Sequence, residues 1–288
     1  MKPIDQFTIT DAVLDAMASC PDERLRTIMS ALVRHLHDFA RDVELTEVEW
    51  ERGIRFLTEA GHITDENRQE FILASDVLGL SMLVTALNNA KPAGCTESTV
   101  FGPFYVEGAP AVENGADISN GARGTPCFVE GQVCGFEGEP IAGALMNVWQ
   151  SDEEGFYDVQ RPSPSGGHEH RARAQLQTDE QGRFHFRSIL AQEYSIPDDG
   201  PVGRLLEALG RHPWRPPHLH FMIEAPGYER LITHVFRRDG PYLDSDAVFG
   251  VRPTLIADWE RHEGNGPGEP PVYYTLEYDF VLNPEPGI

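Results

Sequence analysis

The residues with the clearest capacity for chemistry are two histidines one position apart, His218 and His220, in the run Arg215–Ile223. This run alternates as a β-strand does, and side chains at positions i and i+2 of a strand point to the same face. The two imidazoles can therefore approach one point, as the ligands of a metal ion do. A His-x-His pair on a strand is nevertheless often two half-buried or surface histidines, so the pair alone favours the structural interpretation.

Other residues must complete any metal site that the pair belongs to. A neighbouring carboxylate would make a two-His-one-carboxylate iron site, but the chain has no convincing carboxylate in that pattern. His168-Glu169-His170 superficially offers one, yet its Gly-, Ser- and Arg-rich surroundings favour a loop. Tyr157 and Tyr194 are further candidates, although a tyrosine is ordinarily a partly buried ring with a hydrogen-bonded hydroxyl.

The composition excludes several classes of function. The chain has 288 residues, 40% hydrophobic and 24% charged, values that are ordinary for a soluble globular protein with a sizeable core. Its formal net charge of -23 argues against a basic surface for nucleic acid and against a strongly anionic substrate steered by the whole surface. A neutral or weakly acidic small molecule fits this charge better.

The cysteines and the N-terminus indicate a compartment. Cys20, Cys95, Cys127 and Cys134 are scattered without a C-x-x-C motif, which predicts reduced thiols in a cytoplasmic protein and leaves a Cys127–Cys134 pairing open. The chain contains no run of about 18 apolar residues, so no membrane span is expected. Residues 1–5 lack the charged and apolar regions of a secretory signal.

Residues up to about 92 are predicted to be helical. Pro21 opens a segment whose apolar residues recur at steps of three and four. Thr46 and Glu49 have the spacing of a capping box, and Gly61 is the expected stop of the helix that follows. A third segment, from about residue 67 to 90, is apolar around much of its circumference, which predicts burial within the chain or against a partner subunit.

Strand-length patterns replace the helical ones near residue 95, where Gly and Pro become frequent. Short strands, long polar loops and turn signals predict an antiparallel β-sandwich. The expected fold class is α+β, with a helical N-terminal domain over 1–98 and a β-sandwich catalytic domain over 99–288. The expected strands are 127–133, 144–149, 183–188, 218–224, 231–236 and 273–282, with one short helix at 201–209.

Several motifs resemble those of the intradiol ring-cleavage dioxygenases. They are Gly155-Phe156-Tyr157, Tyr194 shortly before a proline, the run Gly210–Phe221 that contains the His-x-His pair, and Thr99–Pro110. The resemblance covers nearly the whole chain, and two tyrosines followed by His-x-His in this order are highly specific to that family.

The resemblance implies a non-haem Fe(III) ion whose ligands are Tyr157, Tyr194, His218 and His220. Phenolates are hard anions that favour ferric iron, and the charge of the metal ionises a phenol whose free pKa is near about 10. The implied substrate is a catechol-type diol that binds as a dianion and is opened by O2 between its hydroxylated carbons. Tyr194 then leaves the metal and accepts a substrate proton, while Tyr157 stays bound.

Arg215 lies three residues before the first histidine of the pair. The resemblance implies that its guanidinium stabilises negative charge that develops on the ring. The alternative is an arginine in a structural ion pair.

A second group of residues implies the substrate. Catechol-type relatives usually carry Gln where this chain has His234, and residues 100–104, 231–236 and 242–251 resemble the branch that oxidises hydroxyquinol (benzene-1,2,4-triol) to 3-hydroxy-cis,cis-muconate and maleylacetate. Catechol and chlorocatechols are the alternative substrates. Asp76, on an otherwise apolar helix, is expected to read the third hydroxyl, or else to cap a helix or pair with an arginine. The implied pocket residues are Leu73, Asp76, Val100, Phe101, Gly102, Pro103, Phe104, Ile196, Pro197, Arg215 and Val248.

The family also implies a homodimer formed through the N-terminal helices, with an amphipathic lipid in a tunnel at the interface. Two rival classes stand beside the dioxygenase. One is a metal-free β-sandwich that binds or carries a ligand. The other is a zinc hydrolase that uses His218, His220 and a carboxylate.

Overall fold

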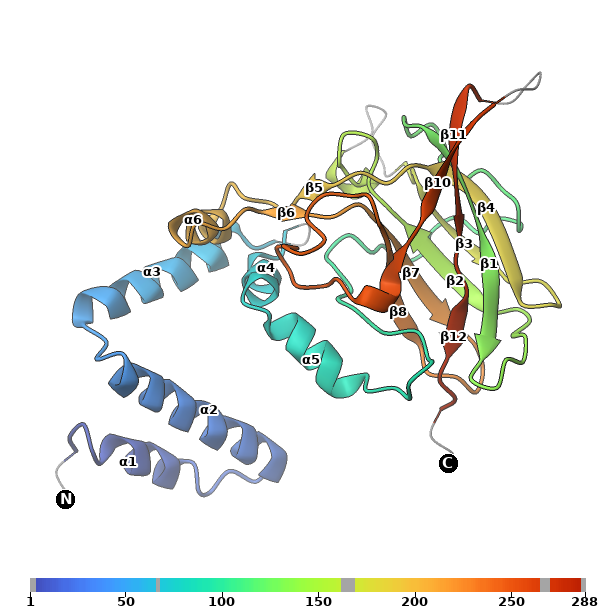
Figure 1. Ribbon diagram of the computed structural model, residues 1–288. Coiled ribbons are helices and arrows are strands. Elements are labelled where there is room, and N and C mark those ends of the chain that lie inside the picture. The colour runs from blue at the N-terminus through green and yellow to red at the C-terminus, as the bar shows by residue number, and fades with distance from the viewer. Residues whose placement is uncertain (1–3, 66–67, 162–168, 265–269, 286–288) are drawn as a thin grey trace. The chain divides into compact units, whose positions relative to one another are not determined.

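The computed structural model describes residues 4–65, 68–161, 169–264 and 270–285 (Figure 1). The chain divides into two compact units, residues 1–59 and 60–288. The sequence predicts a domain boundary between residues 98 and 99, where composition and expected function change. That boundary differs from the division between residues 59 and 60 and stays a prediction.

The first unit is helical. It contains α1 (Ile9–Ala16), α2 (Glu23–Asp42) and most of α3 (Glu47–Ile63). Asp22 caps α2, because its side chain accepts a hydrogen bond from the backbone N–H of Leu25 at 2.9 Å.

The capping box at the start of α3 is confirmed. The backbone N–H of Thr46 donates to Glu49 Oε2 at 2.9 Å, and the backbone N–H of Glu49 donates to Thr46 Oγ1 at 3.3 Å. The predicted stop at Gly61 is wrong by two residues, since α3 ends at Ile63. A helix tolerates an interior glycine when the surrounding residues sustain it.

The third predicted helical segment is two helices, α4 (Glu70–Val77) and α5 (Leu80–Asn88). Gly79 separates them with a φ of 76°, a left-handed conformation that a continuous helix does not allow. The start predicted near residue 67 lies outside the described residues. Among the helices in the described ranges, none alone is long and apolar enough to cross a membrane; α4 and α5 meet that criterion only as a pair bent by 77°.

Two five-stranded sheets form the second unit (Figure 1). One has the order β10-β11-β1-β12, with β4 also paired to β1, and the other has the order β3-β2-β7-β8-β9. A short pair, β5 with β6, stands apart from them. The strands are β1 (Pro126–Gly135), β2 (Leu145–Trp149), β3 (Arg173–Gln177), β4 (Arg183–Ile189), β5 (Tyr194–Ser195), β6 (Trp214–Arg215), β7 (His218–Glu224), β8 (Leu231–Arg237), β9 (Ile256–Ala257), β10 (Trp259–Glu263), β11 (Val272–Glu277) and β12 (Phe280–Leu282); the remaining helices are α6 (Pro201–Ala208) and the 3₁₀ turns η1 (Asp158–Gln160) and η2 (Pro253–Leu255).

The sheets are mixed, which corrects the prediction of a purely antiparallel sandwich. β11 and β12 both pair with β1 in parallel, and β9 pairs in parallel with β8. β11 follows its antiparallel partner β10, and no hairpin joins β11 to β1, so β11 can run in the same direction as β1. The predicted strand 273–282 is broken between β11 and β12, where Asp279 Oδ1 accepts a hydrogen bond from the backbone N–H of Gln132 at 2.8 Å.

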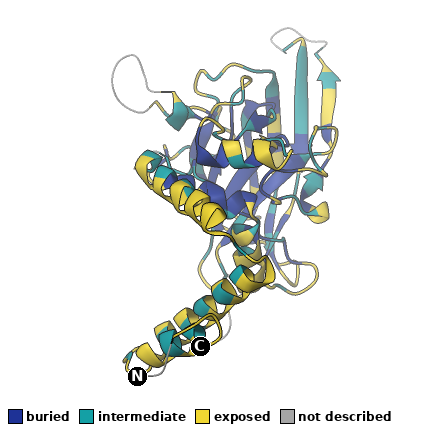
Figure 2. Cartoon of the chain, turned by 90° about the vertical axis from the view of Figure 1, so that its left-hand side faces the viewer, coloured by how far each residue is buried: buried dark blue, intermediate teal, exposed yellow. Residues whose placement is uncertain are grey.

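The hydrophobic core contains residues from both sheets, and Figure 2 shows the buried residues concentrated there. β7 is buried along nearly its whole length. Its alternate residues Leu219, Phe221 and Ile223 belong to the core. His218 and His220, which alternate with them along the strand, therefore face the opposite side of the sheet. The fold thus fixes the direction of the pair through the burial of its neighbours.

Candidate active site

β7 delivers the His-x-His pair to a fully enclosed face of its sheet. His218 and His220 are each 1% exposed, and their Nε2 atoms lie 3.1 Å apart. His218 Nδ1 lies 2.7 Å from the backbone oxygen of Pro216. Because a carbonyl oxygen only accepts, Nδ1 carries the proton and the Nε2 lone pair of His218 is directed into the site. This is the arrangement that orients a metal-binding histidine.

Both tyrosines reach the same place from other parts of the chain. Tyr157 lies directly before η1, and its Oη is 2.8 Å from Nε2 of His220. Tyr194 is in β5, and its ring lies 5.2 Å from that of Tyr157 at an interplanar angle of 83°. The backbone N–H of Tyr157 donates to the Gln160 side chain at 2.8 Å, which holds the turn that presents the ring. The structure brings together the residues that the sequence predicts as ligands.

The donor set fits a metal cation. Burial lowers the pKa of His218 to about 3 and the pKa of His220 well below the ordinary 6.5, so both imidazoles are neutral and offer lone pairs at neutral pH. Burial raises the pKa of Tyr157 well above 10.0. A phenol in such a place ionises when a bound cation supplies the compensating charge.

A third histidine belongs to this cluster, and sequence reasoning did not identify it as a potential ligand. His234 in β8 lies directly opposite His220, and the donor atoms of His218, His220 and His234 all lie within 4.8 Å of one another. Its ring stacks on that of His218 at 4.5 Å and 16°. The sequence singled out His234 as a position that differs from catechol-type relatives, and placed it two residues before the end of a predicted strand. The cluster could hold a metal ion.

Arg215 is the cation of this site. The residue is 2% exposed, and Nη1 donates to Tyr194 Oη at 3.1 Å. On its other side, Nε donates to Asp246 Oδ1 at 3.0 Å and Nη2 lies 3.3 Å from Oδ2. Asp246 also accepts the backbone N–H of Gly250 at 2.9 Å. The ion pair that the sequence offered as the alternative is observed, and Arg215 also contacts Tyr194. The stabilisation of charge on a substrate ring stays a prediction.

Asp246 is a site residue that sequence reasoning missed. It is 5% exposed, and the Arg215 guanidinium holds the pKa of its carboxyl below the ordinary value despite burial. It lies 31 residues beyond Arg215 in a loop without regular structure, so no periodicity could connect the two.

The loop of residues 100–104 covers the site. Phe104 stacks on Tyr157 with ring centroids 4.4 Å apart. Gly102 has a φ of 78°, and a Cβ there would lie 3.4 Å from Cε1 of His220, so the backbone approaches the histidine closely. Val100 is buried and Phe101 is exposed, while Pro103 lies between Gly102 and Phe104 with intermediate exposure.

The other predicted pocket residues come from α4 and from loops. Asp76 is 5% exposed, burial raises its pKa, and Arg215 and Asp246 are close enough to act on that pKa. Leu73, Ile196 and Val248 are buried, and Pro197 is of intermediate exposure.

Two cavities in the described residues are lined in part by residues of the site. One of about 270 Å³ touches Tyr157 and Asp158, and one of about 500 Å³ touches Asp246. The predicted pocket residues line neither of them, so the substrate pocket stays a prediction. Of the His168–His170 motif, His168 lies outside the described residues, and His170 lies 4.0 Å from Asp158.

Two family models match this chain. The model described as catechol dioxygenase N terminus matches residues 22–96, and the model described as dioxygenase matches residues 100–284. Together they span the chain from α2 to β12, with a gap at residues 97–99.

Curated relatives match over almost the full length. A 6-chlorohydroxyquinol 1,2-dioxygenase of Cupriavidus pinatubonensis is 59% identical over 99% of both chains. A hydroxyquinol 1,2-dioxygenase of Nocardioides simplex is 50% identical over 96% of this chain and 94% of its own. Among solved structures, the hydroxyquinol 1,2-dioxygenase of Pseudomonas putida DLL-E4 superposes with a TM-score of 0.89 at 44% identity, covering 97% of this chain and 99% of that one.

Proposed function

This chain belongs to the intradiol ring-cleavage dioxygenase family, and from that membership we propose that it cleaves hydroxyquinol with O2 between the two adjacent hydroxylated carbons. The product is 3-hydroxy-cis,cis-muconate, which tautomerises to maleylacetate. The names of the relatives at 59% and 50% identity support hydroxyquinol or its chlorinated form as the substrate. Catechol and chlorocatechols are the alternative substrates.

The observation that carries the proposal is the convergence of the two tyrosines and the His-x-His pair. Tyr157 Oη and His218 Nε2 both lie within 3.1 Å of His220 Nε2, in a site that is closed to solvent. Neutral imidazoles and ionisable phenols are the ligands that suit ferric iron, because phenolate is a hard anion. We therefore propose that Tyr157, Tyr194, His218 and His220 hold Fe(III). A bound Fe(III) ion supplies the charge that ionises the phenols and the substrate, and it activates the ring toward O2.

The residues of the chain have separable roles in this proposal. Tyr194 Oη accepts a proton from a substrate hydroxyl. Arg215 Nη1, which lies 3.1 Å from Tyr194 Oη, stabilises the negative charge that develops on the substrate ring. The Phe104 ring, stacked on Tyr157, excludes water from one side of the site. We propose that Asp76, close to Arg215, reads the third hydroxyl of hydroxyquinol, and that the remaining predicted pocket residues form the walls.

Metal analysis and colour test this proposal against its rivals. Tyrosinate-to-iron charge transfer should make the purified protein red, with about one iron per chain expected by elemental analysis. The three buried histidines within 4.8 Å of one another also suit zinc. A colourless protein with stoichiometric zinc would therefore favour the hydrolase, and a colourless protein without metal would favour the binding protein.

Steady-state rates decide the substrate. Hydroxyquinol, 6-chlorohydroxyquinol, catechol and chlorocatechols are compared under air with the same iron-loaded preparation. We expect the highest kcat/KM on hydroxyquinol or its chlorinated form. A preference for catechol would reject the substrate while leaving ring cleavage intact. In Asp76→Ala, an unchanged preference for hydroxyquinol over catechol would reject the role proposed for Asp76.

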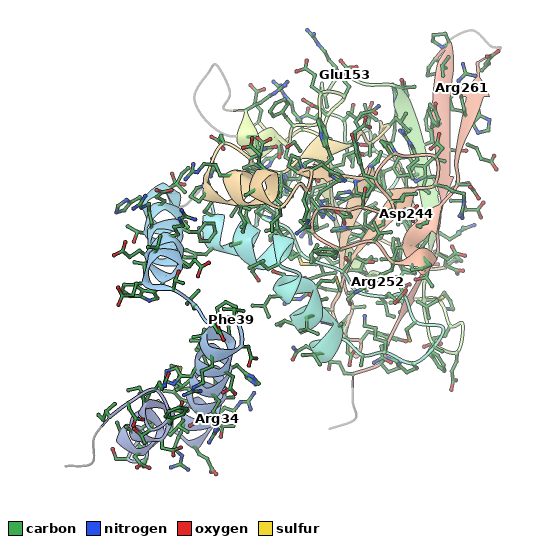
Figure 3. The ribbon with its side chains drawn as sticks, turned by 60° about the vertical axis from the view of Figure 1, so that its left-hand side comes forward. Arg34, Phe39, Glu153, Asp244, Arg252 and Arg261 are labelled. Atoms are coloured by element: carbon green, nitrogen blue, oxygen red, sulfur yellow. The ribbon has the colours of Figure 1, made fainter. Side chains whose placement is uncertain are left out.

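We also propose a homodimer formed through the N-terminal helices, with a lipid at its interface, in the cytoplasm. The supporting observation is a row of exposed apolar side chains along α2, including Leu32, Leu36 and Phe39, which is labelled in Figure 3. Native mass spectrometry tests both parts, because a lipid adds its mass to that of the dimer.

A further inference from the structure

We propose that Arg173 is a positioning residue that fixes Tyr157 and its surroundings from behind the site. This inference rests on the proposed function, because it assigns Arg173 to the support of a ferric tyrosinate. Arg173 lies in β3 and was no part of the predicted site. Its side chain is 2% exposed, and that of its partner Asp158 is 3% exposed.

The first contact reaches the chain neighbour of Tyr157. Arg173 Nε donates to Asp158 Oδ2 at 2.9 Å, and Nη2 donates to Oδ1 at 2.7 Å. This two-pronged pairing fixes the direction of the carboxylate as well as its distance. Asp158 begins η1 directly after Tyr157, and its Oδ1 also accepts the backbone N–H of Val159 at 3.0 Å. The position of the Tyr157 backbone is thereby tied to β3.

The second contact reaches the ring that covers Tyr157. Arg173 Nη2 also donates to the backbone oxygen of Phe104 at 2.7 Å. Phe104 stacks on Tyr157 with centroids 4.4 Å apart and planes inclined by 22°. One guanidinium therefore holds both the turn that carries the phenol and the loop that packs on it.

The third connection runs through the sheet to the histidines. Arg173 is directly opposite Trp149 in β2, and Trp149 is directly opposite His220 in β7. Side chains directly opposite each other lie on the same face. The Trp149 indole stacks on the His220 imidazole at 4.7 Å and 17°. Arg173, Trp149 and His220 thus form one row across three neighbouring strands, and this row connects Arg173 to the histidine side of the site.

The buried charges of Arg173 and Asp158 also act on the electrons of a phenolate at Tyr157. Arg173 and Asp158 are buried with opposite charges, so removing either one leaves the other uncompensated in a medium of low dielectric. A buried cation near Tyr157 stabilises a phenolate there, and a buried anion does the reverse. The pair therefore sets the electron density of the tyrosinate as well as its position.

The experiment compares Arg173→Met and Asp158→Asn with the unmodified enzyme, all loaded with Fe(III), by absorption spectroscopy. Loss of the cation raises the energy of the tyrosinate electrons, so we expect the charge-transfer band of Arg173→Met to move to longer wavelength. Loss of the anion should move the band of Asp158→Asn to shorter wavelength. We also expect about a 10- to 100-fold loss of Fe(III) affinity in Arg173→Met, measured by competition with a chelator.

Arg173→Lys is the variant to use if Arg173→Met does not fold, because it keeps the charge and cannot hold Asp158 and Phe104 together. It should leave the band near its original wavelength and still weaken Fe(III) binding. The matched control is Arg68→Lys, which keeps the charge of a partly buried arginine and loses the guanidinium that contacts both Glu70 and Asp199. The control should lower the melting temperature and leave both band and affinity unchanged.

The outcomes separate the two proposals. An unmodified protein that is colourless after loading with Fe(III) would reject the proposed function. A red unmodified protein whose band and affinity match those of the folded Arg173 and Asp158 variants would reject the positioning role alone. Opposite band shifts in the two variants would support it, since a merely structural ion pair would change stability and leave the spectrum unmoved.

Discussion

At the scale of single residues, the site is a set of buried polar groups whose partners define what each can do. His218 is fixed by the Pro216 carbonyl, Tyr157 by contact with His220, and Arg215 by Asp246. Buried groups of this kind keep one protonation state over a wide pH range. His218 and His220 are therefore neutral before a cation binds, whereas Tyr157 loses its proton when the cation binds.

The Asp246→Asn variant tests the support of Arg215. Asparagine keeps the shape but loses the charge, so Arg215 becomes a buried cation without its partner, at a cost of about 3–5 kcal/mol in the free energy of unfolding. We expect a lower melting temperature and a kcat reduced about 10- to 100-fold as the guanidinium loses its alignment with Tyr194. The control is Asp258→Asn, since Asp258 pairs with Arg238 at the surface, where such a pair contributes about 0–1 kcal/mol. Equal effects of the two substitutions would contradict the positioning of Arg215 by Asp246.

The buried histidines predict an acid-sensitive metal-free protein. His218 has a pKa of about 3 in the folded protein and near 6.5 when exposed, so below pH 6.5 the unfolded chain binds a proton that the folded chain does not. The free energy of unfolding should therefore fall as the pH decreases from about 6.5 toward 3, by about 1.4 kcal/mol per pH unit for each such histidine. Urea unfolding of the metal-free protein measures this dependence of the free energy of unfolding on pH. The two pH values are 7.0 and 5.5, roughly one on each side of pH 6.5.

A matched variant isolates one histidine of the cluster. Burial also lowers the pKa of His234 well below 6.5, so the His234 imidazole takes up a proton when the protein unfolds below pH 6.5. The His234→Asn variant lacks this imidazole and takes up one proton fewer. The pH dependence should become shallower by about 1.4 kcal/mol per pH unit. The surface variant His35→Asn, on an exposed part of α2, should leave the slope unchanged. A slope that is the same in all three proteins would mean that His234 is already protonated when folded.

At the scale of elements, sequence periodicity predicts what a single strand or helix buries. The expected strand 218–224 coincides with β7, and the helix expected at 201–209 is α6 (Pro201–Ala208). Alternation within β7 was enough to predict that His218 and His220 share a face. The break between α4 and α5 was missed, because Gly79 in an apolar helical pattern looks like a tolerated interior glycine.

Contacts between elements could not be predicted from the same signals. Asp246 meets Arg215 across 31 residues, and Arg173 meets Asp158 across 15. Arg173 reaches the site because the register of β3 against β2 places it opposite Trp149. Register depends on the hydrophobic patterns of both paired strands and on the connection between them, so the pattern of one strand alone does not fix it. The resemblance to a known family therefore identified the expected ligands, and only the fold identified Asp246 and Arg173 beside them.

Gly79→Ala tests the bend at the element scale. Gly79 has a φ of 76°, and a left-handed conformation costs a residue with a side chain roughly 1–2 kcal/mol. We expect a loss of that size in the free energy of unfolding, measured with urea. Gly53→Ala is the control, because Gly53 is inside α3 and an added Cβ meets no atom within 4 Å. Alanine there should instead stabilise the helix by roughly 0.5–1 kcal/mol. Destabilisation by both substitutions would argue against a special conformation at Gly79.

At the scale of the whole molecule, the surface of α2 is unusual for an independent monomer. Leu25, Ile28, Leu32, Leu36 and Phe39 are 46–55% exposed, with values of 48%, 47%, 46%, 55% and 53%. They recur at steps of three and four, so they form one stripe on the helix. Contiguous apolar patches of this kind mark interaction surfaces more often than free surfaces. The proposed homodimer would bury this stripe against a second copy of the chain.

Leu32→Glu combined with Leu36→Glu tests the stripe as a dimer surface. Two carboxylates within it would have to be buried without partners in a dimer, which is costly for charged groups. Size-exclusion chromatography with light scattering should show a shift from twice the chain mass of 32.1 kDa toward the monomer, while the iron colour remains. Arg34→Glu on the same helix changes the charge at an exposed position outside the stripe, and it should leave the mass of the dimer unchanged. A monomeric unmodified protein would reject the homodimer. A double variant that stays dimeric would show that the dimer interface lies elsewhere than on the α2 stripe.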